Sequence, residues 1–127
     1  MFHYTVDTSK TVEEAIESLE ENLKKEQFGL LWQFDIKEKL QDKGLEFDQS
    51  FRVLEVCNPF DAQRVLQQNQ LVGYFLPCKI VVYEGDNGTK IGMPKPTALV
   101  ELTEDESVKR YAKEIEDRLI ECINQSK

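Results

Sequence analysis

The sequence is short of the residue types on which most recognisable functional sites depend. It has three widely spaced cysteines and a single histidine. An odd number of scattered cysteines is not a disulfide framework. A zinc site built from His3, Cys57 and Cys78 would need a further ligand, and the chain has no Cys-x-x-Cys pair. We therefore expect no metal and no cofactor, and composition alone identifies no reaction.

Long apolar runs and basic clusters are missing as well. No stretch is long and apolar enough to cross a bilayer. Met1 to Lys10 lacks the basic start and apolar segment of a secretory signal. The net charge is −8, and the lysines and arginines mostly stand beside acidic residues, so no basic patch for phosphates is visible. We expect a cytoplasmic protein that binds neither nucleic acid nor membrane.

The residues that are present describe one globular domain. A length of 127 residues is that of a single domain, here residues 1–127. Hydrophobic residues make up 40% and charged residues 31%, as in soluble globular proteins. At this length the chain can form a real core without disulfide or metal staples.

The stretch from Phe51 to Tyr83 organises the fold. Phe51 to Val56 is apolar on both faces, which predicts a strand covered on both sides. Asn58 and Pro59 then predict a helix start, because Asn caps free backbone N–H groups and Pro suits the first helical position. After Gly73 we expect a second strand, Tyr74 to Tyr83. Pro77 inside it cannot donate to a sheet, so it indicates an edge or a bulge.

Periodicity and capping residues place the other elements. We expect strands at Phe2 to Val6, Leu30 to Ile36, Thr89 to Met93 and Thr97 to Leu102. We expect helices from Thr11, which begins a capping box, to about Gln27, over Ile36 to Lys43, and after a cap at Thr103. Asn87-Gly88 predicts a tight hairpin turn.

These elements add up to an α+β fold. We expect a two-layer sandwich with a mixed or antiparallel sheet of about five strands and three main helices on one face. The other face would present the polar sides of the first two strands: His3, Thr5, Gln33 and Asp35. The two-sided apolar pattern of the central strands indicates that this face is not simply wet. A dimer interface or a ligand groove would explain both observations.

The order and spacing of several short motifs resemble a known family. They are Cys57-Asn58-Pro59 with Ala62 and Val65-Leu66, then Leu76-Pro77-Cys78 leading into Ile80 to Tyr83, and finally Lys95-Pro96-Thr97. Together they resemble the domain-of-unknown-function family 302 over most of the chain. The resemblance implies a compact α+β domain that forms a dimer. It brings no reaction and no catalytic residue with it.

Two thiols are the strongest chemical candidates. Cys57 precedes a predicted helix N-terminus, whose dipole lowers a thiol pKa and raises its reactivity. Cys78 enters the partner strand and could approach Cys57. The competing interpretation is that both are buried, inert side chains, since free cysteine behaves as a small hydrophobe. Cys122 lies in an apolar helix stripe and is expected in the core.

Other candidate residues each have an ordinary structural explanation. His3 is the only histidine and lacks a catalytic partner, so an exposed or interface position on a strand is the alternative. Asp35 and Glu55 lie in strands, where they could be an acid–base pair or could pair with Arg52 and Lys79 across strands. Three aromatic residues could line an apolar pocket or simply fill the core: Trp32, Phe34 and Tyr83. The stiff Gly92 to Thr97 segment could close over a groove or simply connect elements.

Our first hypothesis is a cytoplasmic, homodimeric binding domain without catalytic activity. Its ligand would be a small apolar or amphipathic molecule near Cys57 and Cys78. The expected contact residues are Asn58, Pro77, His3 and Asp35. The alternative is a thiol-dependent redox or sulfur-transfer protein, with Cys57 as nucleophile and Cys78 as resolving thiol. A purely structural or partner-binding role is the third hypothesis.

Overall fold

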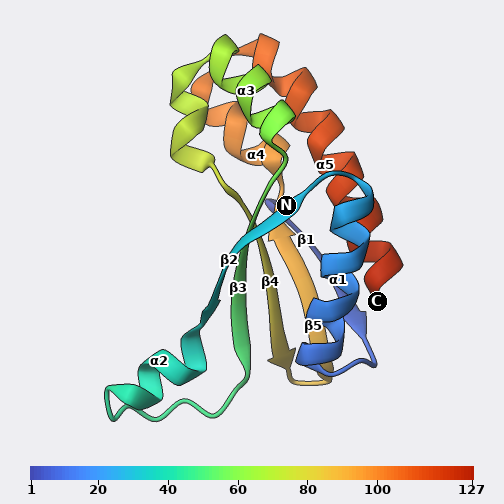
Figure 1. The fold of residues 1–127 in the computed structure, drawn as a ribbon. Coiled ribbons are helices and arrows are strands. Elements are labelled where there is room, and N and C mark those ends of the chain that lie inside the picture. Colours follow the sequence, from blue (N-terminus) through green and yellow to red (C-terminus); the bar gives the residue numbers. More distant parts are fainter.

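The computed structural model describes residues 1–127 and contains one five-stranded sheet with helices on one face (Figure 1). The strands are β1 (His3–Thr8), β2 (Gly29–Asp35), β3 (Phe51–Cys57), β4 (Cys78–Gly85) and β5 (Gly88–Pro94). Their order is β1-β5-β4-β3-β2, and each neighbouring pair is antiparallel. The predicted α+β sandwich is confirmed.

The helical elements are α1 (Val12–Lys25), α2 (Ile36–Asp42), α3 (Pro59–Gln68), the 3-10 turn η1 (Gln70–Phe75), α4 (Pro96–Val100), the 3-10 turn η2 (Glu101–Thr103) and α5 (Glu106–Ser126). The five α-helices lie in three places. Helices α1 and α5 lie side by side over the sheet, while α3 and α4 pack against the first half of α5 past the end of the strands (Figure 1). Helix α2 extends from the other end of β2 and buries none of its residues.

The core lies between the sheet and the α1–α5 pair. Alternate residues of the three central strands are buried there: Leu54, Val56, Ile80, Val82, Ile91 and Met93. Helix α1 starts with the predicted capping box, in which Thr11 and Glu14 bond reciprocally to each other's backbone. Because the covered sheet positions alternate with uncovered ones, a second sheet surface faces away from all these helices. We call this surface the open face.

The open face has an apolar half and a polar half. Four aromatic rings, which we call the aromatic patch, lie on β2, β3 and β4: Trp32, Phe34, Phe51 and Tyr83. They stack in pairs, with ring centroids 5.3 Å apart for Trp32–Phe34 and 5.0 Å for Phe51–Tyr83. Towards β1 the same face carries a Lys90–Asp7 ion pair and a His3–Thr5 hydrogen bond. Within the chain, helices cover only one side of the central strands, and Trp32 is 52% exposed rather than core.

A β-bulge explains why the faces of β2 differ from the simple alternation. Leu30 pairs with Val56 and Trp32 pairs with Glu55, so Leu31 is an extra residue between them. The insertion turns Leu30 towards the helices and leaves Trp32 on the open face. It also places Gln33 and Asp35 on the helix-covered side, not on the open face where the alternation had put them.

Three predicted segment boundaries were wrong. Residues 74–77 are not strand, because η1 continues to Phe75 and β4 starts only at Cys78, so Pro77 stands before a central strand rather than inside an edge strand. Residues 97–102 form α4 and η2, with Pro96 at the first helical position instead of a strand. The cap of α5 is Asp105, which accepts from the Ser107 backbone, and not Thr103.

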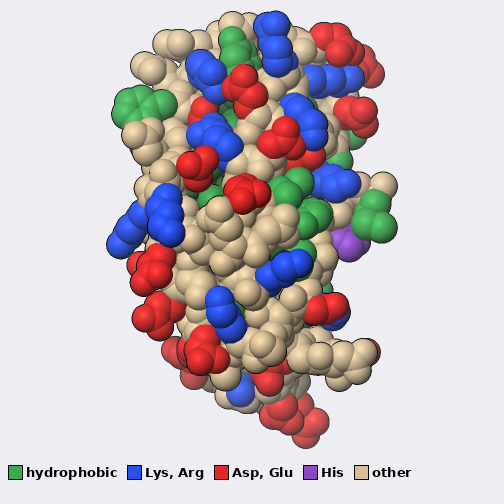
Figure 2. All heavy atoms as spheres, turned by 90° about the vertical axis from the view of Figure 1, so that its right-hand side faces the viewer, with side chains coloured by type: hydrophobic (Ala, Val, Ile, Leu, Met, Phe, Trp, Pro, Cys, Tyr) green, Lys and Arg blue, Asp and Glu red, His purple; other side chains and the backbone are tan.

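The outer surface of the α1–α5 layer is charged but mixed in sign. Figure 2 shows lysine and arginine side chains interspersed with aspartate and glutamate over this side of the molecule, without a continuous basic area. None of the helices has the length and hydropathy needed to cross a bilayer.

Candidate functional site

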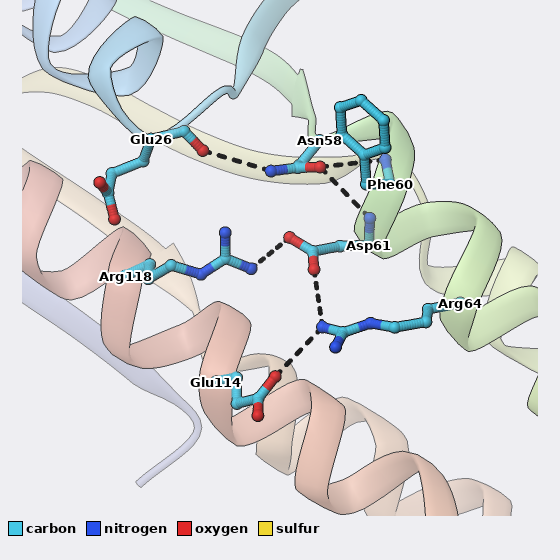
Figure 3. A network of polar contacts seen from close by, with 7 residues as sticks. All are labelled: Glu26, Asn58, Phe60, Asp61, Arg64, Glu114 and Arg118. Carbon is cyan, nitrogen blue, oxygen red and sulfur yellow. Dashed lines mark hydrogen bonds and ion pairs between the residues drawn. The ribbon is translucent and has the colours of Figure 1, made fainter.

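The turn from β3 into α3 forms as its sequence predicts. The Asn58 side chain accepts hydrogen bonds from the backbone N–H groups of Phe60 and Asp61, at 3.0 and 3.2 Å. Its amide also donates to the Glu26 carbonyl at 3.2 Å, which joins the turn to the end of α1 (Figure 3). Asn58 is buried, and both its amide oxygen and its amide nitrogen take part in these bonds. It therefore positions α3, and its side chain does not line the apolar cavity described below.

Asp61, one turn into α3, is the centre of a polar network (Figure 3). Its carboxylate is 7% exposed and binds two arginines, Arg118 of α5 and Arg64 of α3, the latter at 2.8 Å. Arg64 also reaches Glu114 of α5 at 3.1 Å. A buried carboxylate needs such partners, because an unpaired charge in the interior is costly. The network therefore fixes α3 against α5.

An apolar cavity of about 320 Å³ lies beside this junction. Its walls are formed by the start of β4, the end of β5, and the helical elements α3, η1, α4 and α5. Representative wall residues, one from each of these elements, are Val65, Val72, Cys78, Met93, Leu99 and Ala112. The cavity opens to the surface beside Tyr74, whose side chain is 84% exposed, so a small molecule can enter it from outside.

The α4 wall of the cavity is held by one buried acid. Glu116 of α5 is 5% exposed, and its Oε1 accepts from the Thr97 backbone at 3.0 Å and from the Thr97 hydroxyl at 2.7 Å. These bonds satisfy a free N–H in the first turn of α4, which has no side-chain cap of its own. The Gly92 to Thr97 segment thus leads into a cavity wall, rather than being only a connector on the surface.

The rim of the cavity carries one ion pair. Glu55 and Lys79 are directly opposite each other on β3 and β4, and they project from the open face. The Lys79 Nζ lies 3.6 Å from the Glu55 Oε1. The cross-strand pairing expected from the sequence is confirmed here, and likewise for Asp35 and Arg52, whose ion pair measures 3.2 Å.

The two thiols share a small cleft next to the cavity, but the pKa of each is raised, which makes the thiols less reactive. Cys57 and Cys78 both line this cleft, and Cys78 also lines the cavity itself. Burial, and secondarily the charge of Asp61, raises the pKa of Cys57. Burial, followed by the charges of Cys57 and Asp61, raises the pKa of Cys78 to about 11. The lowering that we expected from the α3 dipole is therefore outweighed by desolvation and by Asp61.

The remaining predicted site residues are dispersed. Pro77 lines the cavity, and its peptide bond with Leu76 is cis. Asp35 caps α2 by accepting from the Glu38 backbone, in addition to its pair with Arg52. His3 bonds to Thr5 on the open face, and neither His3 nor Asp35 lines the cavity. No group of three or more His, Cys, Asp or Glu side chains is placed to hold a metal ion.

Sequence reasoning missed Glu116 and α4. Glu116 follows Ala112 by four residues and precedes Leu119 by three, so it lies on the buried side of α5. This position was a usable signal, because acids are rarely buried without partners. Pro96 at the start of a helix was a second one. Neither residue could have been connected to a cavity, since the contact between α4 and α5 joins segments that are distant in the sequence.

Two comparisons with known proteins point to the same family. The family model described as "Domain of unknown function DUF302" matches residues 4–126. A crystal structure described as that of an uncharacterized conserved DUF302 protein from Bacillus stearothermophilus has a TM-score of 0.98 and 57% sequence identity, covering 100% of this chain and 99% of that chain. Among curated proteins none matches.

Removal of the Asp61 carboxylate tests its role as the link between α3 and α5. We expect Asp61→Ala to lower the free energy of unfolding by about 2 kcal/mol, since its arginine partners keep partial access to water. The matched control is Asp117→Ala, which breaks an exposed pair with Lys113 on α5 and should leave stability nearly unchanged. Urea unfolding measures both, and equal effects of the two substitutions would contradict the assignment.

The raised thiol pKa values predict slow alkylation. At neutral pH we expect Cys57 and Cys78 to react with iodoacetamide more slowly than free cysteine, because little thiolate is present and the side chains are shielded. The rates should rise as the pH approaches the raised pKa values, and also when urea unfolds the protein. Site-resolved mass spectrometry gives the rates. A Cys57 that reacts faster than free cysteine would restore the nucleophile hypothesis.

Proposed function

This chain belongs to the DUF302 family, and we propose that it is a homodimeric domain that binds a small apolar or amphipathic molecule in the cavity between the sheet end and α3, α4 and α5. The observation that carries the proposal is the cavity itself. Its volume of about 320 Å³ falls within the range of small-molecule sites, about 300–1,000 Å³, which are mostly apolar with a few placed polar groups. The Glu55–Lys79 pair at the rim supplies such polar groups.

The surroundings of the cavity favour binding over catalysis. Its one thiol, Cys78, has a pKa of about 11 and is held as the neutral thiol near pH 7. Its two charged groups, Glu55 and Lys79, are paired with each other. An acid–base or nucleophilic mechanism needs a group with a pKa near the working pH. These features support a binding domain without catalytic activity.

A thiol-dependent redox or sulfur-transfer role has weaker support. In its favour, Cys57 and Cys78 border the same small cleft. Against it, burial raises the pKa of both. We also propose a cytoplasmic location, since all three cysteines are free thiols, as is usual in a reducing compartment.

The aromatic patch on the open face supports the dimer. It sets four rings on neighbouring strands, and Trp32 is half exposed. Contiguous exposed apolar surface on a folded domain marks an interaction site. We propose a second copy of the chain as the partner, related by a twofold axis so that the same patch serves both subunits. Helix α2, which projects past the sheet beside this patch and buries nothing in its own subunit, would gain contacts in such a dimer.

Filling the cavity should abolish ligand binding. We expect Ala112→Met to lower the affinity for a neutral apolar fluorescent probe, N-phenyl-1-naphthylamine, at least tenfold, because the added side chain occupies the site. Ala98→Met adds the same atoms on α4 to a residue that does not line the cavity, and it is the control. Fluorescence titration measures binding, and thermal unfolding verifies that both variants fold. Unchanged binding to Ala112→Met would refute a site in this cavity.

Charging the aromatic patch should dissociate the dimer. We expect Trp32→Lys to convert the protein to monomer, since it buries an unpaired charge at the centre of the proposed interface. Phe60→Lys is the control, because Phe60 is an exposed aromatic residue (68%, against 52% for Trp32) on α3, away from the sheet. Sedimentation equilibrium gives the mass. A monomeric unmodified protein, or a dimer that survives Trp32→Lys, would exclude this interface.

A further inference from the structure

The rim pair restricts the chemistry of the ligand's head group. Glu55 and Lys79 are the only charged residues that line the cavity. Their charged atoms are 3.6 Å apart, which is longer than a hydrogen bond, and neither side chain hydrogen-bonds to another part of the protein. The Lys79 side chain is 47% exposed and that of Glu55 26%. The rim therefore offers a free acceptor and a free donor side by side.

The backbone fixes this arrangement relative to the apolar cavity. The two residues are register partners on adjacent central strands, so their Cα atoms cannot separate without breaking the sheet. The aliphatic stems of both side chains can cover apolar surface while their charged ends remain at the mouth. A ligand with its apolar part among Leu99, Val72 and Ala112 would thus place its head group next to both charges.

A head group with a single charge is poorly matched to this rim. A carboxylate attracted by Lys79 would stand within a few ångströms of the Glu55 carboxylate, and an ammonium attracted by Glu55 would stand beside Lys79. In either case attraction and repulsion act over similar distances and nearly cancel, and one rim charge also loses its partner. A neutral group that donates to Glu55 and accepts from Lys79 satisfies both charges without repulsion.

From this geometry, and on the premise that the proposed function holds, we propose that the ligand is an amphipathic molecule whose head group is neutral overall and both donates and accepts hydrogen bonds, such as a carboxamide. Its apolar part occupies the cavity, its N–H group donates to the Glu55 carboxylate, and its oxygen accepts from the Lys79 ammonium. Free fatty acids and alkylamines are then the wrong classes of ligand for this protein.

Three probes with the same alkyl chain test the head-group preference. Octanamide, octanoate and octylamine are titrated into the purified full-length protein by calorimetry at neutral pH, where they are neutral, anionic and cationic. We expect octanamide to bind about tenfold more tightly than either charged probe, because hydrogen bonds to charged groups are among the strongest polar contacts.

Two near-isosteric variants of the rim should change this selectivity in opposite directions. With Glu55→Gln only Lys79 remains charged, so octanoate should gain affinity and overtake octylamine. With Lys79→Met only Glu55 remains, so octylamine should gain and overtake octanoate. Each variant retains the long side chain at the rim, and the loss of a partly exposed pair costs little stability. Circular dichroism and thermal unfolding show whether both are folded.

The outcomes separate this inference from the proposed function. If all three probes bind the unmodified protein equally, or if octanoate or octylamine binds best, the head-group inference is overturned while the cavity remains a binding site. Variants that leave the order of the probes unchanged also overturn it. If none of the probes binds, and the fluorescent probe does not bind either, the proposed function itself fails.

Discussion

The buried carboxylate of Asp61 connects the two parts of the molecule between which the cavity lies. Helix α3 follows β3 directly, and its path depends on the Asn58 cap at its start and on the two arginines that bind Asp61. One of these, Arg118, belongs to α5 and thus to the layer that covers the sheet. Because α3 and η1 form one side of the cavity and α5 another, this contact fixes the distance between the walls.

The two surfaces of the sheet differ in what covers them. On one side α1 and α5 bury an alternating set of aliphatic residues, and this burial provides the main stabilisation of the fold. On the other side the fold supplies no cover, and aromatic side chains stack on one another instead. The cavity reaches the open face through Glu55 and Lys79, so a ligand at the rim and a partner on the aromatic patch would occupy neighbouring parts of one surface. Trp32, a member of the aromatic patch, pairs with Glu55 of the rim across β2 and β3.

The environment of the cysteines shows why residue type and position are insufficient evidence for chemistry. Cys57 precedes a helix N-terminus, which by itself favours a thiolate. In the folded protein it is partly desolvated and lies near the Asp61 carboxylate, and both effects favour the neutral thiol. The acid that secures α3 against α5 therefore also opposes ionisation of the neighbouring thiols. A stability requirement of the fold and thiol reactivity are in conflict at this position.

The sequence by itself determined the features whose causes lie within a few residues or across one strand pair. Capping at Thr11 and Asn58, the hairpin at Asn87-Gly88 and the Glu55–Lys79 pair were predictable, because local hydrogen bonding and strand alternation encode them. Only the tertiary structure decided the helical state of residues 96–100, which Glu116 supports from another helix, and the side of the sheet on which Trp32 lies, which a single bulge changes. It also decided the cavity, since the shape of a cavity depends on how helices from distant segments pack, and no local pattern records the space that they leave unfilled.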